Sequence, residues 1–214
     1  MDNPSIDLKA SNLEAKKLAL IAMLSAITIV VAYARGLGLS SLPGLVEFMT
    51  VMIFVSGFCF GWVVGVSVGF VAVIIYMLIP YPFAHPAAWL FTISPVLLLV
   101  MGLLGALYGI VGGFFGKLRN PARIDIKFVA ELSFLGFVLT FIYDIFSSIG
   151  FYLAYPVYPS VWEAIYLTFI PLYYPYPPII HTVTNTIVFA VVAPAIIHAI
   201  HVFSVYFKVP PPKT

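Results

Sequence analysis

Charged side chains are scarce in this chain. Asp, Glu, Lys and Arg make up 8% of its 214 residues, hydrophobic residues make up 63%, and the mean hydropathy is +1.11. A soluble domain carries roughly a quarter charged residues, so this composition excludes one and predicts an integral membrane protein. At roughly 20 residues per spanning helix, the length leaves room for about six helices. We therefore expect a single integral membrane domain over residues 1–214.

Cysteine is nearly absent, and the motifs of several enzyme classes are missing. The only cysteine, Cys59, lies in an apolar run, so the sequence offers no disulfide framework and no thiolate metal cluster. It contains no Walker motif for ATP and no recognisable nucleophile motif. His198 and His201 lack nearby carboxylates in the sequence, which favours interfacial packing over metal binding. We expect no enzymatic activity, no cofactor and no metal site.

Apolar segments alternate with breaks at Gly, Pro or charged residues. They cover approximately residues 14–34, 46–60, 62–79, 88–116, 128–153 and 178–206. This pattern predicts an all-α membrane protein, a bundle of six transmembrane helices. The weakest boundary is Phe60-Gly61-Trp62, because one long bent helix would give the same pattern. Residues 160–172 have a modest helical pattern, typical of a helix lying flat at the outer surface.

The basic residues predict the orientation in the membrane. With six spans and the amino terminus inside, nine of the ten Lys and Arg residues lie on the cytoplasmic side, and only Arg35 lies outside. This agrees with the positive-inside rule, whereas an odd number of spans would misplace a terminus or the basic loop 117–127. We expect a multi-pass protein of the cytoplasmic membrane with both termini in the cytoplasm.

Polar residues within the apolar spans gather at the outer ends of the predicted helices. An ionisable residue at the bilayer centre costs roughly 2.5 kcal/mol or more, and is tolerated mainly where it faces a cavity or partner. Asp144 lies about 24 Å up its helix, in the outer half of the membrane. His181 and Asn185 lie one turn apart on one face of the last helix. The candidate substrate-binding residues are Arg35, Glu47, Tyr81, His85, Trp89, Asp144, Ser148, His181 and Asn185.

These residues predict a binding pocket that opens to the outside. Acid, base, amide and aromatic groups together suit a polar heterocycle such as a vitamin. Two alternatives stay open. Isolated pairs, such as Arg35 with Glu47, would merely neutralise each other at the interface. The external segments rich in proline and tyrosine would serve either as stiff lids or as an aromatic belt.

Small residues form two kinds of helix face. Ala15, Ala19, Ala22 and Ala26 are spaced by four, three and four residues, so they lie on nearly one face of the first helix. Such a strip lets another helix approach closely, either a partner's or one of this chain's own. The glycines of the later helices favour tight internal packing; they are Gly57, Gly61, Gly65, Gly69, Gly102, Gly105, Gly109, Gly112, Gly113 and Gly116.

Over nearly its whole length the chain resembles the substrate-binding S components of energy-coupling factor (ECF) vitamin transporters. In that family an Ala-x-x-x-Ala motif on the first helix docks against a shared transmembrane coupling subunit, and Ala22-Met23-Leu24-Ser25-Ala26 matches it. The run from Phe60 to Gly69 is similar to a segment where many members carry Gly-Pro-x-x-Gly, with Trp62 in place of the usual proline. The segment 178–185, which leads to Pro194, is similar too.

The resemblance implies a high-affinity binding subunit that captures a vitamin or vitamin precursor from outside. It would deliver this substrate inward with the coupling subunit and two separately encoded ATPase subunits. Members that bind nickel or cobalt begin with Met-His, whereas this chain begins Met1-Asp2, which favours an organic substrate. Thiamine-like, riboflavin-like, pantothenate-like and corrinoid compounds remain open. The alternative function is a membrane subunit or assembly factor of a redox complex, or a small oligomeric pore.

Overall fold

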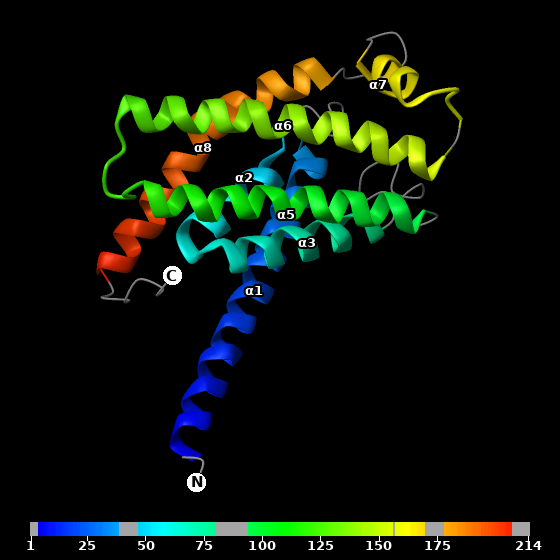
Figure 1. The fold of residues 1–214 in the computed structure, drawn as a ribbon. Helices are drawn as coiled ribbons and strands as arrows, with labels where there is room; N and C mark the ends of the chain where they lie inside the picture. The colour runs from blue at the N-terminus through cyan, green and yellow to red at the C-terminus, as the bar shows by residue number, and fades with distance from the viewer. Residues whose placement is uncertain (1–3, 39–46, 80–93, 156, 170–177, 207–214) are drawn as a thin grey trace.

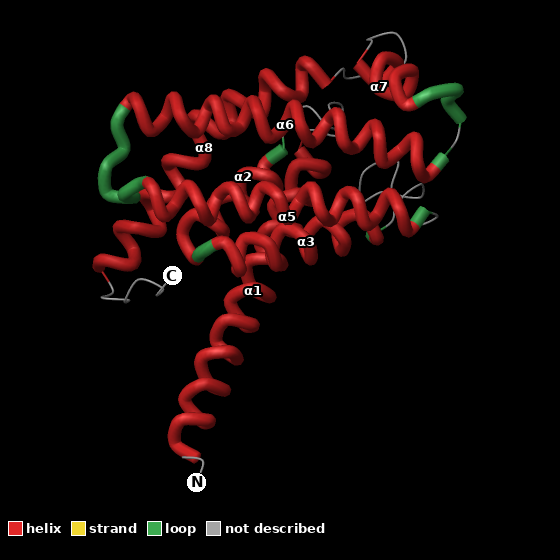
Figure 2. The backbone as a smooth tube through the Cα atoms, viewed as in Figure 1, coloured by secondary structure: helices red, strands yellow, loops and turns green. Residues whose placement is uncertain are grey.

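The structure, a computed structural model, describes residues 4–38, 47–79, 94–155, 157–169 and 178–206. Within these ranges every regular element is a helix (Figures 1 and 2). The helices are α1 (Pro4–Gly38), α2 (Phe48–Phe60), α3 (Trp62–Leu78), α5 (Pro95–Leu118), α6 (Ile126–Ala154), α7 (Val161–Phe169) and α8 (Pro178–Tyr206). The predicted all-helical fold class is confirmed.

Each of the predicted apolar segments contains a helix, and the short α7 occupies the segment predicted to lie at the surface. Within the described ranges, four helices are long and apolar enough to cross a membrane: α1 over Glu14–Tyr33, α5, α6 and α8. The helices α2 and α3 have only 13 and 17 residues. The lengths and composition of these helices support a membrane-embedded bundle, while six crossings remain a prediction. Residues 88–93 of the fourth predicted segment lie outside the described residues.

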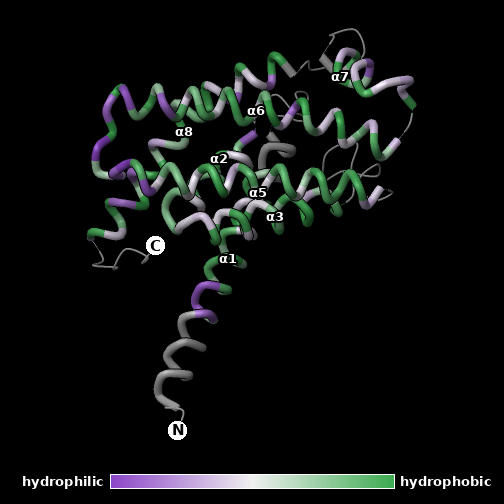
Figure 3. Tube along the Cα trace, in the orientation of Figure 1, coloured by the Kyte–Doolittle hydropathy of each residue, from purple (hydrophilic) through white to green (hydrophobic). Residues whose placement is uncertain are grey.

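The outer surface of the bundle is hydrophobic, as lipid contact requires. Large side chains such as Leu103, Phe134 and Val191 are exposed on the long helices. Hydrophilic residues concentrate in the turn between α5 and α6 (Figure 3). In this turn Arg119 forms an ion pair with Glu131, and the carboxylate of Asp125 accepts a hydrogen bond from the first turn of α6. The turn and the carboxyl end of α8 lie at one end of the bundle, opposite α7 (Figure 1).

Gly61 separates α2 from α3. Its φ of 92° lies in the left-handed region, which glycine adopts at little cost and other residues avoid. The backbone N–H of Gly61 donates to the carbonyl oxygen of Gly57 at 2.8 Å and so closes α2. The chain thus turns sharply here, and the predicted pair of short helices is confirmed over one long bent helix.

Glycine backbones make the tightest helix contacts. A Cβ added to Gly109 of α5 would lie 2.1 Å from the carbonyl oxygen of Gly65 in α3. A Cβ added to Gly57 of α2 would lie 2.2 Å from the carbonyl oxygen of Gly109. A Cβ on Gly69 would meet the carbonyl oxygen of Gly105 at 2.3 Å. Because no side chain fits at these positions, α2, α3 and α5 pack with their backbones nearly in contact. The predicted tight internal packing of the glycines is confirmed at these positions.

The helices α6 and α8 pack along each other and close the bundle over α2 and α5 (Figure 1). Gly136 of α6 leaves room for the ring of Phe189 in α8, because an added Cβ would lie 2.5 Å from Phe189 Cβ. Phe189 is fully buried, and its ring centroid lies 5.3 Å from that of Phe54 and 6.1 Å from that of Tyr108. These three rings form the core where α2, α5 and α8 meet.

Candidate functional site

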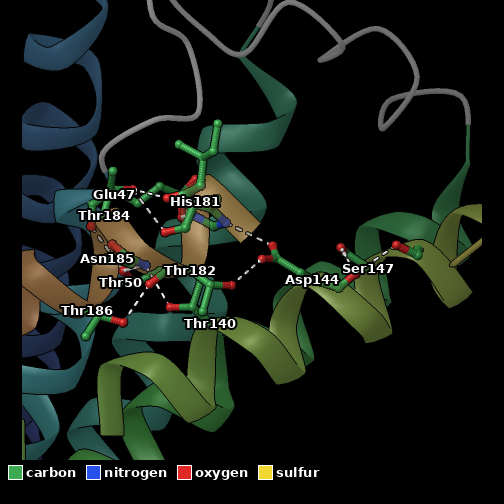
Figure 4. Close-up of polar contacts among 12 residues, drawn as sticks. Glu47, Thr50, Thr140, Asp144, Ser147, His181, Thr182, Thr184, Asn185 and Thr186 are labelled. Atoms are coloured by element: carbon green, nitrogen blue, oxygen red, sulfur yellow. Dashed lines mark hydrogen bonds and ion pairs between the residues drawn. The ribbon is translucent and has the colours of Figure 1, made fainter. Parts of the chain in front are cut away.

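Three ionisable side chains meet between the start of α2, the middle of α6 and the start of α8 (Figure 4). His181 Nδ1 lies 2.9 Å from Asp144 Oδ1, and His181 Nε2 lies 3.7 Å from Glu47 Oε2. Asp144 and His181 are only 6% and 8% exposed. Because a buried charge is costly unless it is paired, the imidazole between two carboxylates links these three helices electrostatically.

Helical spacing explains why these side chains converge. Thr140 and Asp144 lie one turn apart on α6, and His181 and Asn185 lie one turn apart on α8, so each pair projects from one helix face. The two faces oppose each other, and the hydroxyl of Thr182 donates to Asp144 Oδ2 at 3.2 Å. We call Glu47, Thr50, Thr140, Asp144, His181, Thr182 and Asn185 the buried polar cluster.

The deeper part of the buried polar cluster is organised by one amide. Asn185 Nδ2 donates to Thr140 Oγ1 at 2.9 Å and to Thr50 Oγ1 at 3.3 Å. Thr140 Oγ1 also lies 3.2 Å from the hydroxyl of Tyr108 in α5. Asn185 and Thr140 are fully buried. A single side chain of α8 thereby connects α2 and α6 directly, and α5 through Thr140.

The hydrogen bond of Thr50 determines which way the Asn185 amide faces. The Thr50 hydroxyl donates its only hydrogen to the backbone carbonyl of Glu47 at 3.0 Å. It can therefore only accept from Asn185, which must turn its NH₂ group toward Thr50. The amide oxygen Oδ1 is buried, and it has no hydrogen-bond partner among the described residues. The same holds for His181 Nε2.

A cavity of about 10 Å³ adjoins the buried polar cluster. It is lined by Ala32, Glu47, Phe48, Met49 and Tyr76. This volume is close to the minimum that holds one water molecule. The cavity is too small for an organic molecule, so a substrate that binds at this point would have to displace neighbouring side chains.

The structure brings part of the predicted site together. Glu47, Asp144 and His181 come into contact, and Asn185 lies one turn deeper. Ser148 is buried, but its hydroxyl donates to the backbone carbonyl of Asp144 at 2.8 Å and is thus engaged within α6.

The other candidates are not described to the level of their side chains. Arg35 lies in α1, and its side chain is outside the described part of the structure. Tyr81, His85 and Trp89 lie outside the described residues altogether. Their place in a pocket, and any pairing of Arg35 with Glu47, stay predictions.

The threonines of the buried polar cluster and Tyr108 were not among the site residues predicted from the sequence. Threonine is common in membrane helices because its hydroxyl can bond its own helix, as Thr186 does with the carbonyl of Thr182 at 2.6 Å. Only spacing could have singled out Thr140, which lies one turn before Asp144 on the same face of α6. Tyr108 carries no comparable signal, since it lies in an apolar helix among glycines.

The predicted alanine strip lies on α1, whose amino-terminal half projects away from the rest of the bundle (Figure 1). The inward face of α1 carries Leu24, Ser25, Thr28 and Ala32, which are buried. The strip residues Ala15, Ala19, Ala22 and Ala26 are all exposed. At about 100° per residue the strip lies roughly opposite the buried face. The described bundle therefore uses another face of α1 for its internal packing.

A hydrophobic helical bundle that buries charged and amide side chains between three helices is typical of a membrane protein that binds a polar solute. The family described as "ECF transporter, substrate-specific component" matches residues 16–209. The chain belongs to this family, which confirms the predicted resemblance. Comparisons with curated proteins and with solved structures give no match. Members of this family are transport subunits, so family membership makes this chain a transport subunit.

Proposed function

We propose that this protein is the high-affinity binding subunit of an ECF-type importer, and that it captures a vitamin or vitamin precursor from outside. The observation that carries the proposal is the burial of Asp144, His181 and Asn185 at the junction of α2, α6 and α8. Ionisable groups in a membrane span are costly and are usually kept for binding or transport. The same groups supply the hydrogen bonds that a polar heterocycle needs.

Aromatic side chains border the ionisable groups. The ring of Tyr143 lies edge-on to the imidazole of His181, with ring centroids 6.4 Å apart. Aromatic faces and edges beside hydrogen-bonding groups suit a flat ring system. We propose that Glu47, Asp144, His181 and Asn185 contact the substrate. The remaining predicted contacts would complete the site; they are Arg35, Tyr81, His85, Trp89 and Ser148.

We further propose that the protein works with a transmembrane coupling subunit and two ATPase subunits. Family membership supports this partnership, and the sequence itself contains no ATP-binding motif. The exposed alanine strip on α1 is the proposed docking surface, because small residues let helices approach closely in lipid. Its position opposite the buried face of α1 leaves it accessible to a partner helix.

Substituting the strip tests the docking proposal. Ala22→Trp and Ala26→Trp should abolish co-purification with the coupling subunit, since a bulky ring holds the two helices apart. Substrate binding should persist, because the strip does not pack inside the bundle. Ile27→Trp is the matched control: Ile27 is also exposed, 42%, but lies beside the strip. Loss of both properties in the two alanine variants would mean that the strip is needed for folding.

Calorimetry with a vitamin panel tests the binding proposal. The purified protein should bind at least one compound with a dissociation constant below micromolar. Asp144→Asn should weaken that binding because it replaces a carboxylate acceptor with an NH₂ donor, and Asn185→Ala should weaken it because it removes the amide. A protein that binds nothing tighter than micromolar, or variants that bind as tightly as wild type, would contradict the proposed function.

A further inference from the structure

The amide oxygen of Asn185 is an unpaired acceptor at the deepest point of the buried polar cluster. Asn185 is fully buried, and Oδ1 has no hydrogen-bond partner among the described residues. A buried polar atom without a hydrogen bond destabilises the folded state, so native proteins seldom keep one without a role. The bond from Thr50 to the Glu47 carbonyl prevents the amide from turning over to pair Oδ1 with Thr50.

Water in the adjoining cavity does not account for this acceptor. The cavity of about 10 Å³ is lined by Ala32, Glu47, Phe48, Met49 and Tyr76, and Asn185 is not among these residues. His181 Nε2, one turn toward the start of the helix, likewise has no hydrogen bond among the described residues, although it lies 3.7 Å from Glu47 Oε2. Asn185 Oδ1 and His181 Nε2 therefore both lie on the α8 face that opposes Asp144 and Thr140 (Figure 4).

The chemistry of the neighbouring groups restricts what can satisfy Asn185 Oδ1. An amide oxygen can only accept, so its partner must supply an N–H or O–H group. Ionised carboxylates and phosphates bring acceptors alone. They would also approach the carboxylate of Asp144, whose two oxygens already accept from His181 and Thr182.

We propose that the substrate carries a nitrogen ring or amine with an N–H group, that this group donates to Asn185 Oδ1, and that compounds with an anionic head group are rejected. The inference rests on the proposed function and names the substrate class of the same site. Because the adjoining cavity has room for about one water molecule, side chains of the buried polar cluster must move aside to admit the substrate. The substrate N–H then donates to Asn185 Oδ1, which has no hydrogen-bond partner among the described residues.

Matched pairs of compounds test this directly by calorimetry on the full chain in detergent. Thiamine and its 4′-deamino analogue differ by an amino group, riboflavin and 3-methylriboflavin differ by one ring N–H, and pantothenate supplies the carboxylate. We expect one N–H compound to bind at least 10-fold more tightly than its blocked partner, because the blocked compound leaves Oδ1 unpaired. Pantothenate should bind more weakly than either N–H compound.

Variants of Asn185 show whether the preference comes from this amide. Asn185→Asp keeps an acceptor and should retain the preference for the N–H compound, whereas Asn185→Ala should reduce the affinity ratio within the pair to near one. Thr186→Val is the control, because the Thr186 hydroxyl bonds the backbone of α8 and lies outside the cluster. A merely structural role for Asn185 would lower both affinities and leave their ratio unchanged.

Three results would overturn the inference: equal affinity within both pairs, tightest binding by pantothenate, or binding of none of the five compounds. The first two leave the proposed function standing, since a vitamin is still bound. If nothing binds, co-purification of the wild-type chain with the coupling subunit tells the two apart. If the wild-type chain still co-purifies with the coupling subunit, the importer assignment stands, and only the proposed N–H substrate class is wrong.

Discussion

Replacing Gly109 with alanine should destabilise the bundle far more than the same change at Gly102 on the same helix. The added Cβ at Gly109 would lie 2.1 Å from both the carbonyl carbon and the oxygen of Gly65, and 2.6 Å from the backbone nitrogen of Val66. These are backbone atoms of α3, and they cannot rotate away. The helices α3 and α5 must therefore separate by roughly 1 Å, which forfeits a quarter to a half of the dispersion energy of the contacts they lose.

At Gly102 the added Cβ would meet the ends of flexible side chains. The nearest atoms are Ile74 Cδ1 at 2.9 Å and Phe70 Cε2 at 3.0 Å, which small rotations can move. Alanine also favours a helix by about 1 kcal/mol over glycine. We expect Gly102→Ala to change the unfolding free energy by less than about 1 kcal/mol, and Gly109→Ala to lower it by about 3 kcal/mol, the upper end of the usual overpacking cost.

Thermal denaturation in detergent, followed by size-exclusion chromatography of the remaining monodisperse protein, measures this difference. For a chain of this size about 3 kcal/mol corresponds to a fall of roughly 6 to 12 °C in the midpoint. Gly102→Ala should remain within about 3 °C of wild type. Equal midpoints for the two variants would refute the close approach of α3 and α5.

Further predictions concern the polar contacts. Thr140→Val should lower the unfolding free energy by about 2 kcal/mol, because the buried hydroxyl of Tyr108 and the amide of Asn185 both lose a hydrogen-bond partner. Adding Tyr108→Phe should recover about half of the loss. A double variant that is less stable than the single one in thermal denaturation would contradict this. Glu131→Gln should lower the unfolding free energy by less than about 1 kcal/mol, because the ion pair of Glu131 with Arg119 is partly exposed. A larger loss in thermal denaturation would contradict this weak contribution.

The sequence predicts most of the fold because the apolar segments are long and sharply interrupted. The helix α8 has the predicted bounds, and the break at Gly61 follows from a residue that tolerates a positive φ. The amino-terminal extension of α1 to Pro4 was not predicted, because residues 4–13 lack an apolar run. Residues 4–13 nevertheless contain Leu, Ala and Lys, which are strong helix formers, and α1 continues through them.

For the candidate site, the sequence predicts the ionisable members of the buried polar cluster but not their neutral partners. Asp144 and His181 stand out because charge is rare and costly in apolar helices. Thr50 and Thr140 have no such signal, since only tertiary structure decides whether a threonine bonds its own helix or another. The orientation of the Asn185 amide depends on Thr50, which lies 135 positions away in the sequence.

Uptake into proteoliposomes tests the importer assignment most directly. The chain would be reconstituted alone or with its coupling and ATPase subunits, and accumulation of the radiolabelled vitamin that it binds would be followed with and without ATP. We predict accumulation only with the complete complex and ATP, whereas the chain alone should bind the vitamin without transporting it. Uptake or ion flux through the chain alone would contradict the account and favour a pore.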